Sequence, residues 1–313
     1  MAIGSDWKES KKSMKGIINM TEYIGIDLGG TSIRVGAIDE SENLIFEYKE
    51  PTFKDVMNGE ELCDKIKRII KKVPNYKDAK AIGLGAPGSV NKKSDKIITS
   101  KNVSILIDFP LVESLNKEFD KPIYIENDAK VAAFAEALVG RGKNKNIVCY
   151  ITISTGLGGG IVMKKNIYKG ANNLGGYFPR IILDGNNTSD SLISGRALYE
   201  QARKRINDNI KNTAELFELY KDGNASAKAI IEEFKHNLVT LLLIISSVIN
   251  PDIIILGGGV LKSKEYYLDE VKKEFKSRVH PLAKSTIVDV AKYEDPGIIG
   301  ACLMAKYKRS RLG

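Results

Sequence analysis

Two segments of the chain, residues 23–36 and 149–163, share one pattern of apolar and polar positions. In each segment an apolar run is followed by a turn of glycines and hydroxyl residues, and then by a second apolar run. The pattern predicts two hairpins of β-strands. Because the same unit occurs twice, the sequence indicates an internal repeat.

Strand and helix patterns alternate after each hairpin, which predicts the α/β fold class. Short β-branched or apolar runs predict strands over residues 43–48, 79–85, 123–128, 253–256 and 286–290. Apolar positions at helical spacing predict helices over residues 59–72, 111–119, 129–138, 195–206, 225–249, about 263–278, and from 297 onward.

The first glycine turn carries candidate chemistry. Asp27 ends the first strand, and Gly29, Gly30 and Thr31 follow it. Bare N–H groups and a hydroxyl suit phosphate oxygens, and a carboxylate suits a hydrated divalent cation. A tight hairpin whose glycines only set the turn explains the same residues. The repeat favours phosphate binding, since the second hairpin has a similar turn with Thr155, Gly156, Gly158 and Gly159.

Further candidates lie where other predicted strands end. Asn127 and Asp128 stand where a strand meets a helix, as an N-cap and a first-turn acid. In a cleft, Asp128 could accept a proton from an alcohol while Asn127 binds a neighbouring hydroxyl. Gly88 lies in a turn at a strand's carboxyl end, where α/β sheets bind ligands, although a plain turn explains it as well.

A run of three glycines, Gly257, Gly258 and Gly259, follows the strand at residues 253–256. Its bare backbone would let a flat base or a ribose approach closely. A loop that needs glycine only for packing is the alternative.

Composition narrows the class of protein. With 313 residues, two domains are expected. The net charge of +9 comes from dispersed lysines without a basic, aromatic-interleaved stripe, so no nucleic-acid partner is expected. The longest apolar run, residues 238–249, is too short to span a membrane, so no membrane partner is expected either.

The cysteines and the head of the chain bear on location. Cys149 and Cys302 lie in apolar surroundings, which predicts buried reduced thiols and a cytoplasmic protein. Residues 1–20 lack the apolar core of a secretory signal and are expected to be disordered or added in cloning.

Five motifs occur in order, at residues 27–31, 126–129, 154–160, 256–259 and 297–301. Together they resemble the ROK family of bacterial sugar kinases and repressors, within the actin-like ATPase superfamily, from residue 23 to the C-terminus. One glycine motif alone is a weak signal, whereas five in order are specific.

The resemblance implies two ribonuclease-H-like lobes with an interlobe cleft that holds ATP and a sugar. The expected lobes are residues 21–128 plus 298–313, and residues 129–297. Asp27 would hold Mg²⁺ directly or through water, the two glycine turns would cradle the phosphates, and residues 257–259 would lie by the nucleoside. Asp128 would be the general base for the C6 hydroxyl, while Gly88, Asn102 and Asn127 would contact sugar hydroxyls. A base of ordinary carboxylate pKa is expected to suffice, because phosphoryl transfer depends mostly on alignment. A homodimer is also implied.

The sequence departs from the family where a Glu-x-Gly-His segment and a zinc-binding cysteine cluster usually follow residues 170–172. Here Tyr177 replaces the sugar-binding glutamate and Arg180 replaces the histidine. No Cys or His lies between Cys149 and His236, so no zinc site is expected. Either the loop is rebuilt for a different or N-acylated sugar, with Tyr177 or Phe178 packing on an acyl methyl, or sugar binding is damaged and the protein is a sensor or a degenerate kinase.

The expected activity is phosphorylation of the C6 hydroxyl of a hexose or an N-acylhexosamine. N-acetylmannosamine is the first choice, because the whole chain resembles the bacterial N-acetylmannosamine kinases of that family. Glucokinase, N-acetylglucosamine kinase and fructokinase activities stay open. A non-catalytic sugar-responsive regulator is the alternative of another class, although about twenty residues before Tyr23 are too few for a helix-turn-helix module.

Overall fold

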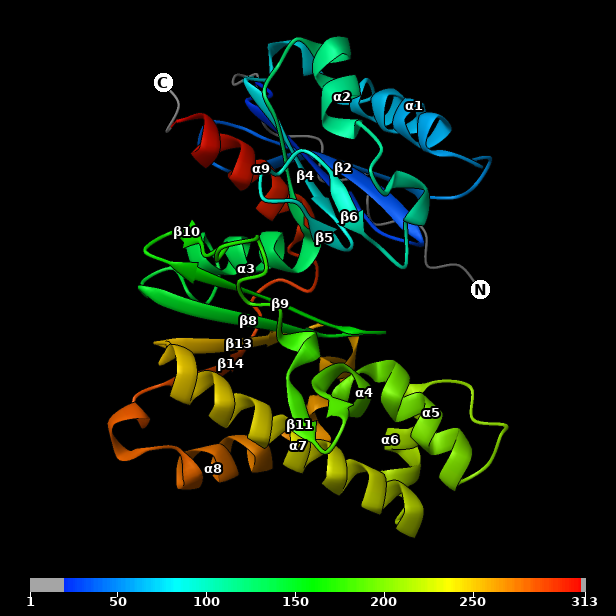
Figure 1. The fold of residues 1–313 in the computed structure, drawn as a ribbon, viewed down its shortest axis with the longest axis vertical. Coiled ribbons are helices and arrows are strands. Elements are labelled where there is room, and N and C mark those ends of the chain that lie inside the picture. The colour runs from blue at the N-terminus through cyan, green and yellow to red at the C-terminus, as the bar shows by residue number, and fades with distance from the viewer. Residues whose placement is uncertain (1–19, 311–313) are drawn as a thin grey trace, which may run out of the picture.

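The structure, a computed structural model, describes residues 20–310 and contains two five-stranded sheets of the same topology (Figure 1). In each sheet the first three strands are antiparallel neighbours, and the last two run parallel to the first. The first sheet has the order β3-β2-β1-β4-β7, with β1 (Tyr23–Leu28), β2 (Ser32–Ile38), β3 (Leu44–Pro51), β4 (Ala81–Ala86) and β7 (Ile123–Asn127). The second has the order β10-β9-β8-β13-β14, with β8 (Ile147–Ile153), β9 (Leu157–Met163), β10 (Asn166–Ile167), β13 (Ile253–Gly257) and β14 (Ile287–Val290). The repeated glycine hairpin is therefore the start of a repeated fold unit, and the expected two-lobed α/β fold is confirmed.

Helices cover the first sheet. An apolar core lies between this sheet and the two helices α1 (Gly59–Ile70) and α2 (Leu111–Phe119). The last helix, α9 (Gly297–Arg309), returns to contact β1 and β4. A small hairpin of β5 (Ser89–Val90) and β6 (Ile97–Thr99) projects from this lobe (Figure 1).

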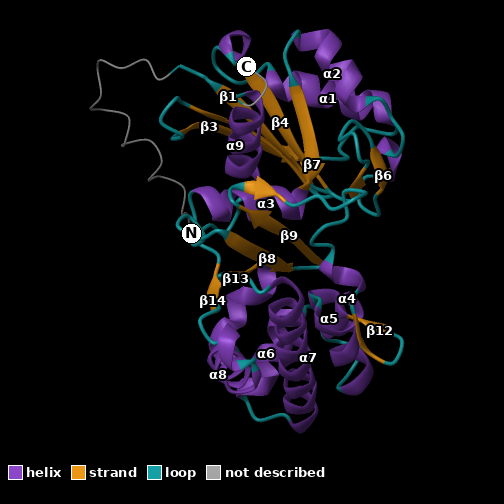
Figure 2. Cartoon of the chain, turned by 60° about the vertical axis from the view of Figure 1, so that its left-hand side comes forward, coloured by secondary structure: helices purple, strands orange, loops and turns teal. Residues whose placement is uncertain are grey.

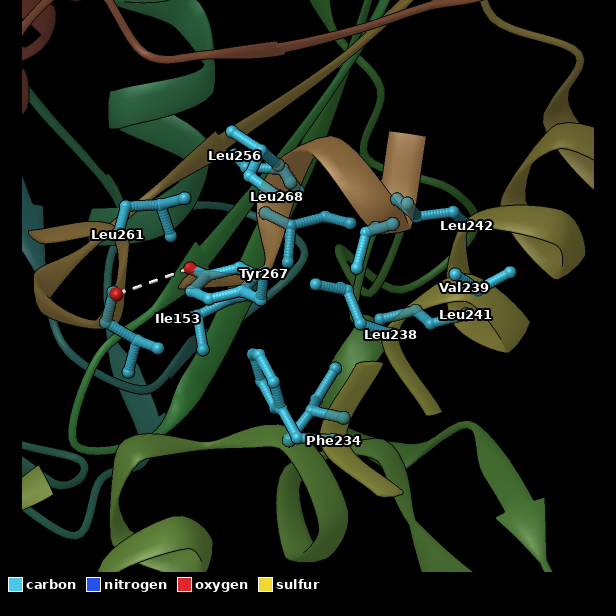
Figure 3. Packing of buried hydrophobic residues seen from close by; sticks show 14 of the residues in the cluster. Ile153, Phe234, Leu238, Val239, Leu241, Leu242, Leu256, Leu261, Tyr267 and Leu268 are labelled. Atoms are coloured by element: carbon cyan, nitrogen blue, oxygen red, sulfur yellow. Dashed lines mark hydrogen bonds between the residues drawn. The ribbon is translucent and has the colours of Figure 1, made fainter. Parts of the chain in front are cut away.

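The second sheet packs on a larger helical layer. That layer contains α4 (Ser189–Ile193), α5 (Gly195–Arg205), α6 (Thr213–Lys221), α7 (Ala225–Ile249) and α8 (Leu268–Arg278), with a short ribbon of β11 (Ile182–Asp184) and β12 (Asn187–Thr188). The 3₁₀ helices in the described chain are η1 (Tyr76–Asp78), η2 (Ser104–Leu106), η3 (Phe178–Arg180), η4 (Gly259–Tyr266) and η5 (Pro281–Ala283). Figure 3 shows Tyr267 inside this core beside Phe234, with its hydroxyl donating to the Val260 carbonyl at 3.2 Å.

Two helices lie between the sheets. The helix α3 (Asp128–Leu138) packs on β8 and β9 and also contacts α9 (Figure 2). The close approach of α3 and α9 explains the small residues at the start of α9. Because α9 returns to the first sheet, we propose the lobe boundaries 21–128 plus 298–313, and 129–297.

One predicted helix is placed wrongly by the sequence pattern. The helix expected from about residue 263 is a 3₁₀ helix up to Tyr266, and α8 begins only at Leu268. Ser263 has non-helical backbone angles, and the buried Tyr267 interrupts the helix because its ring packs on Phe217 and Phe234. Tertiary packing therefore overrides the local periodicity.

The remaining sequence expectations concern thiols, membranes and the head. All three cysteines are buried free thiols. Within residues 20–310, no helix combines the length and the apolar character that crossing a membrane requires. The expected disordered or added head lies outside the described residues, except for residue 20.

Candidate active site

A cleft of about 740 Å³ lies between the two sheets and is lined from both. Asp27 comes from the end of β1, Asp128 from the start of α3, and Gly257–Gly259 from the end of β13. Residues 290–297, which lead into α9, form another wall. The structure thus brings together the proposed base, the proposed metal-binding carboxylate and the glycines expected near the nucleoside.

Asp128 is held at the first turn of α3. Asn127 caps this helix, since its side-chain oxygen accepts from the Lys130 N–H at 3.2 Å. Oδ1 of Asp128 accepts from the Ala129 N–H at 2.7 Å and from Nδ2 of Asn127 at 2.9 Å. The carboxylate is therefore fixed in orientation and half-buried at the cleft.

The ionisation of Asp128 is shifted by its surroundings. Burial raises the pKa of Asp128 to about 7, and the negative charge of Asp27 adds to the rise. The sequence predicted that an ordinary carboxylate pKa would suffice, and it gave no sign of this shift. A base whose pKa lies near neutral pH suits general base catalysis.

Asp27 lies in a network of charges that the sequence reasoning missed. Arg34 is its register partner on β2, and the guanidinium contacts the carboxylates of both Asp27 and Asp295. Gly297 starts α9 directly against Asp27, where any Cβ would collide with the carboxylate. The Asp27 carboxylate is therefore paired with Arg34 in this structure, and Mg²⁺ binding by Asp27 stays a prediction.

The signals for the missed residues differ. The position of Arg34 opposite Asp27 could have been found from the register of the predicted hairpin. Asp295 had no local signal, because it reaches the site only through the fold.

The first glycine turn is braced by the loop after β3. The Gly29 N–H donates to the Ser32 carbonyl at 2.9 Å, and the Thr52 hydroxyl donates to the Gly29 carbonyl at 2.6 Å. The Thr52 N–H donates to the Thr31 carbonyl at 3.1 Å, and the Thr31 side chain is exposed. Gly30 packs closely against Asn102, so this predicted sugar contact lies beside the turn.

The second glycine turn meets the three-glycine turn. Oγ of Ser154 accepts from the Gly259 N–H at 3.1 Å, a link between turns that the sequence did not indicate. Gly258 has φ of +94°, and a Cβ there would lie 2.5 Å from the Ile153 carbonyl oxygen. Glycine is therefore required at this junction.

The predicted phosphate-binding residues of the second turn have different surroundings. Thr155 is exposed and Gly156 lies near the Asp190 carboxylate, which accepts from the Leu157 N–H at 2.7 Å. Gly158 packs near Ala129, and Gly159 packs against the ring of Phe178. These packing contacts account for glycine at 158 and 159, and phosphate binding there stays a prediction.

Of the predicted sugar-binding residues, the structure places Asp128 in the wall of the cleft. Nδ2 of Asn127 donates to the Gly88 carbonyl at 2.8 Å, and Gly88 adopts φ of +109°. Among the described residues, Gly88, Asn102, Asn127 and Tyr177 do not line the 740 Å³ cleft itself. Tyr177 is exposed, whereas Phe178 is buried.

The burial of Phe178 against Gly159 removes it as a contact for a sugar substituent. Of the two residues considered for an acyl group, only Tyr177 has an accessible ring. Within residues 20–310, no cluster of three or more His, Cys, Asp or Glu side chains is arranged to hold a metal ion.

Comparison with known proteins adds to this geometry. The family model described as the ROK family matches residues 23–308. The chain is 26% identical over 312 residues to a glucokinase of Thermotoga maritima, covering 91% of this chain and 97% of that protein. It is 28% identical over 269 residues to an N-acetylmannosamine kinase of Vibrio cholerae, covering 82% of this chain and 89% of that protein.

Solved structures of ROK family proteins are also similar to this chain. A ROK hexokinase from Thermus thermophilus matches with a TM-score of 0.82 and 27% identity, over 93% of this chain and 99% of that one. A ROK family glucokinase from Streptomyces griseus, in complex with glucose and AMPPNP, matches with a TM-score of 0.75 and 26% identity, over 91% and 99% of the two chains.

Proposed function

The chain belongs to the ROK family, and we propose that it is an ATP-dependent sugar kinase acting on the C6 hydroxyl of a hexose or an N-acylhexosamine. The observation that carries the proposal is the pair of carboxylates, Asp27 at the end of β1 and Asp128 at the start of α3, which line one cleft together with the three-glycine turn. The similar proteins named glucokinase and N-acetylmannosamine kinase support the same reaction class.

Asp128 takes the proton of the attacking hydroxyl in this proposal. Its carboxylate is oriented by the Ala129 N–H and by Asn127, so the free lone pairs of Oδ2 can point to a sugar at the cleft edge. Asn127 and Gly88 would contact neighbouring sugar hydroxyls, with Asn102 beside the first glycine turn. With a pKa near 7, the carboxylate is a better proton acceptor than an ordinary aspartate.

The donor nucleotide would lie along the glycine turns. Gly257–Gly259 would meet the nucleoside, and the turns at residues 29–31 and 155–159 would cradle the phosphates. Lys262, Lys264 and Lys292 line the same cleft and add positive potential that favours a polyphosphate. Mg²⁺, when bound with ATP, neutralises charge on the phosphate oxygens, and Asp27 is the residue that would hold it.

We propose N-acetylmannosamine as the preferred sugar. The support is the similar N-acetylmannosamine kinase and the exposed Tyr177 at the position of the family's sugar-binding glutamate. Glucose, N-acetylglucosamine and fructose are the alternatives, and the similar glucokinase favours glucose among them. We also propose a cytoplasmic homodimer without zinc, on the basis of the reduced thiols and the resemblance to the family.

A coupled assay of ADP release over a panel of hexoses and N-acylhexosamines tests the proposal, with Asp128→Asn as the catalytic control. Turnover should be fastest with N-acetylmannosamine and should be lost in the variant. Turnover with glucose alone would keep the kinase and replace the substrate. Binding of a sugar without turnover of any would refute the kinase and favour the sugar-responsive regulator.

A further inference from the structure

A buried cluster of charged and polar side chains lies directly behind the proposed catalytic residues. Glu126, which precedes Asn127, is fully buried, and the buried Lys130 ammonium lies 3.9 Å from its Oε1. Nζ of Lys130 donates to the carbonyl oxygen of Asn173 at 2.6 Å and to its Oδ1 at 3.0 Å. Nδ2 of Asn173 donates to Oε1 of Glu126 at 3.0 Å. The three side chains therefore form a closed ring of contacts.

This ring connects the two lobes. Asn173 belongs to the loop of residues 168–176, which follows β10 of the second sheet, and its Nδ2 also donates to the Val90 carbonyl on β5 at 3.1 Å. Lys169, from the same loop, donates to Oγ of Ser94 in the β5–β6 hairpin at 2.6 Å. Nζ of Lys169 also lies 3.5 Å from Oε2 of Glu126. The loop is thus tied to the first lobe at several points.

Burying these charged side chains costs free energy, and a gain in stability does not explain why they are there. Burial lowers the pKa of Lys130, and the charge of Glu126 opposes that change. A buried ion pair seldom stabilises a fold more than apolar residues of similar size would, whereas removing one partner leaves an uncompensated charge. Such a cluster is best understood by what it fixes in space.

The cluster contacts two segments of the chain that carry proposed sugar-binding residues. Oε1 of Glu126 accepts from the Asn127 N–H at 3.0 Å, so the ring holds the backbone that carries Asn127 and Asp128. On the other side it holds Asn173, four residues before Tyr177. We propose that Lys130 and Asn173 are positioning residues that fasten the loop of residues 168–176 across the lobes and set the geometry of sugar binding. This inference rests on the proposed kinase function.

The test replaces Lys130 with methionine, which keeps most of the length and removes the charge and the donors. The KM for the sugar should rise about tenfold, because the loop of residues 168–176, which leads into Tyr177, loses its hydrogen bonds to Lys130 and shifts. The KM for ATP should stay unchanged. Hydrogen exchange of the backbone amides in residues 168–176 should become faster in the sugar-free protein.

Lys235→Met is the matched control. Lys235 is equally buried and pairs with Glu232 and Glu270, but it joins α7 to α8 and does not line the cleft. This variant should lower stability without changing the KM for the sugar or the exchange of residues 168–176. Equal effects of the two variants on the sugar KM would overturn the inference.

Two further variants keep the test decisive. If Lys130→Met does not fold, Asn173→Ala should show the same rise in sugar KM and the same faster exchange. Adding Glu126→Gln to Lys130→Met should restore part of the lost stability but not the sugar KM, since the buried carboxylate that lost Lys130 as a partner is gone and the loop is still released. Unchanged exchange and sugar KM in both Lys130→Met and Asn173→Ala would refute the positioning role. Absence of kinase activity in the wild type would refute the proposed function instead, and the exchange data would still decide whether the network holds the loop.

Discussion

Asp128→Asn is expected to abolish activity and to stabilise the folded protein at the same time. Asparagine has the shape of aspartate and keeps an oxygen that accepts from the Ala129 N–H and from Asn127. It has no charge and cannot take a proton. Loss of the general base should lower kcat by about 10²- to 10⁴-fold.

The gain in stability follows from the raised pKa. Burial, with a contribution from Asp27, raises the pKa of Asp128 from 3.8 to about 7. That rise is about three pKa units, and at about 1.4 kcal/mol per unit the ionised carboxylate lowers the free energy of unfolding by up to about 4 kcal/mol. The side chain is only half-buried, so solvent screening makes this figure an upper limit.

The raised pKa also determines how the contribution of Asp128 to stability changes with pH. The folded protein binds the proton more tightly than the unfolded chain, so the contribution of Asp128 to stability falls as the pH rises from about 4 to about 7. Asparagine does not titrate. The variant should therefore be more stable than the wild type at pH 8, and the difference should shrink toward pH 4.

Urea unfolding of both proteins at pH 8, 6 and 5, without nucleotide or sugar, measures this difference. In an Asp27→Asn background the gain should be smaller, because one of the two causes of the raised pKa is absent. A variant that is no more stable than the wild type at pH 8 would refute the claim that the carboxylate is desolvated. A gain that does not change with pH would show that the effect is not ionisation.

Three other predictions concern the glycine turns that would bind the nucleotide, and the metal requirement. Gly258→Ala should lower the free energy of unfolding by about 1–3 kcal/mol and raise the KM for ATP, because its φ of +94° is unfavourable for alanine and the added Cβ meets the Ile153 carbonyl; thermal unfolding and kinetics test this. Ser154→Ala removes the acceptor of the Gly259 N–H and should weaken binding of a non-hydrolysable ATP analogue about fivefold without affecting sugar binding, as calorimetry would show. After removal of metals with EDTA, addition of Mg²⁺ without zinc should restore full activity. Stoichiometric zinc in the purified protein, measured by atomic absorption, would contradict the expectation that the segment at residues 177–180 has lost the family's zinc site.

The sequence predicted well what is determined locally. Both glycine hairpins and the strand-to-helix junction at Asn127 follow from turn and capping chemistry within a few residues. The helix at residues 225–249 has the expected bounds, because apolar spacing continues over its whole length and Asn224 caps its start. Such features depend little on the rest of the fold.

The sequence did not predict which distant segments of the chain come into contact. Arg34 meets Asp295 from the other end of the chain, and Asn173 meets Glu126 and the Val90 carbonyl only because the two lobes come together. The raised pKa of Asp128 has the same origin, since its causes are burial in the folded chain and the charge of Asp27, which lies far earlier in the sequence. Residue type and spacing along the chain do not indicate which distant residues meet in the fold.

The relative position of the two cleft carboxylates depends on one helix contact. Asp128 is the first residue of α3, and the first residue of α9, Gly297, lies against Asp27. The two helices pack directly on each other where Gly300 meets the backbone of Val131, and no side chain fits there. Because α9 is anchored on β1 and β4, and α3 on β8 and β9, this contact transmits the arrangement of one sheet to the other. The spacing between the proposed base and the proposed metal-binding carboxylate is therefore set by packing behind the cleft, which explains why small residues at the start of the last helix belong to the same functional unit as the glycine turns.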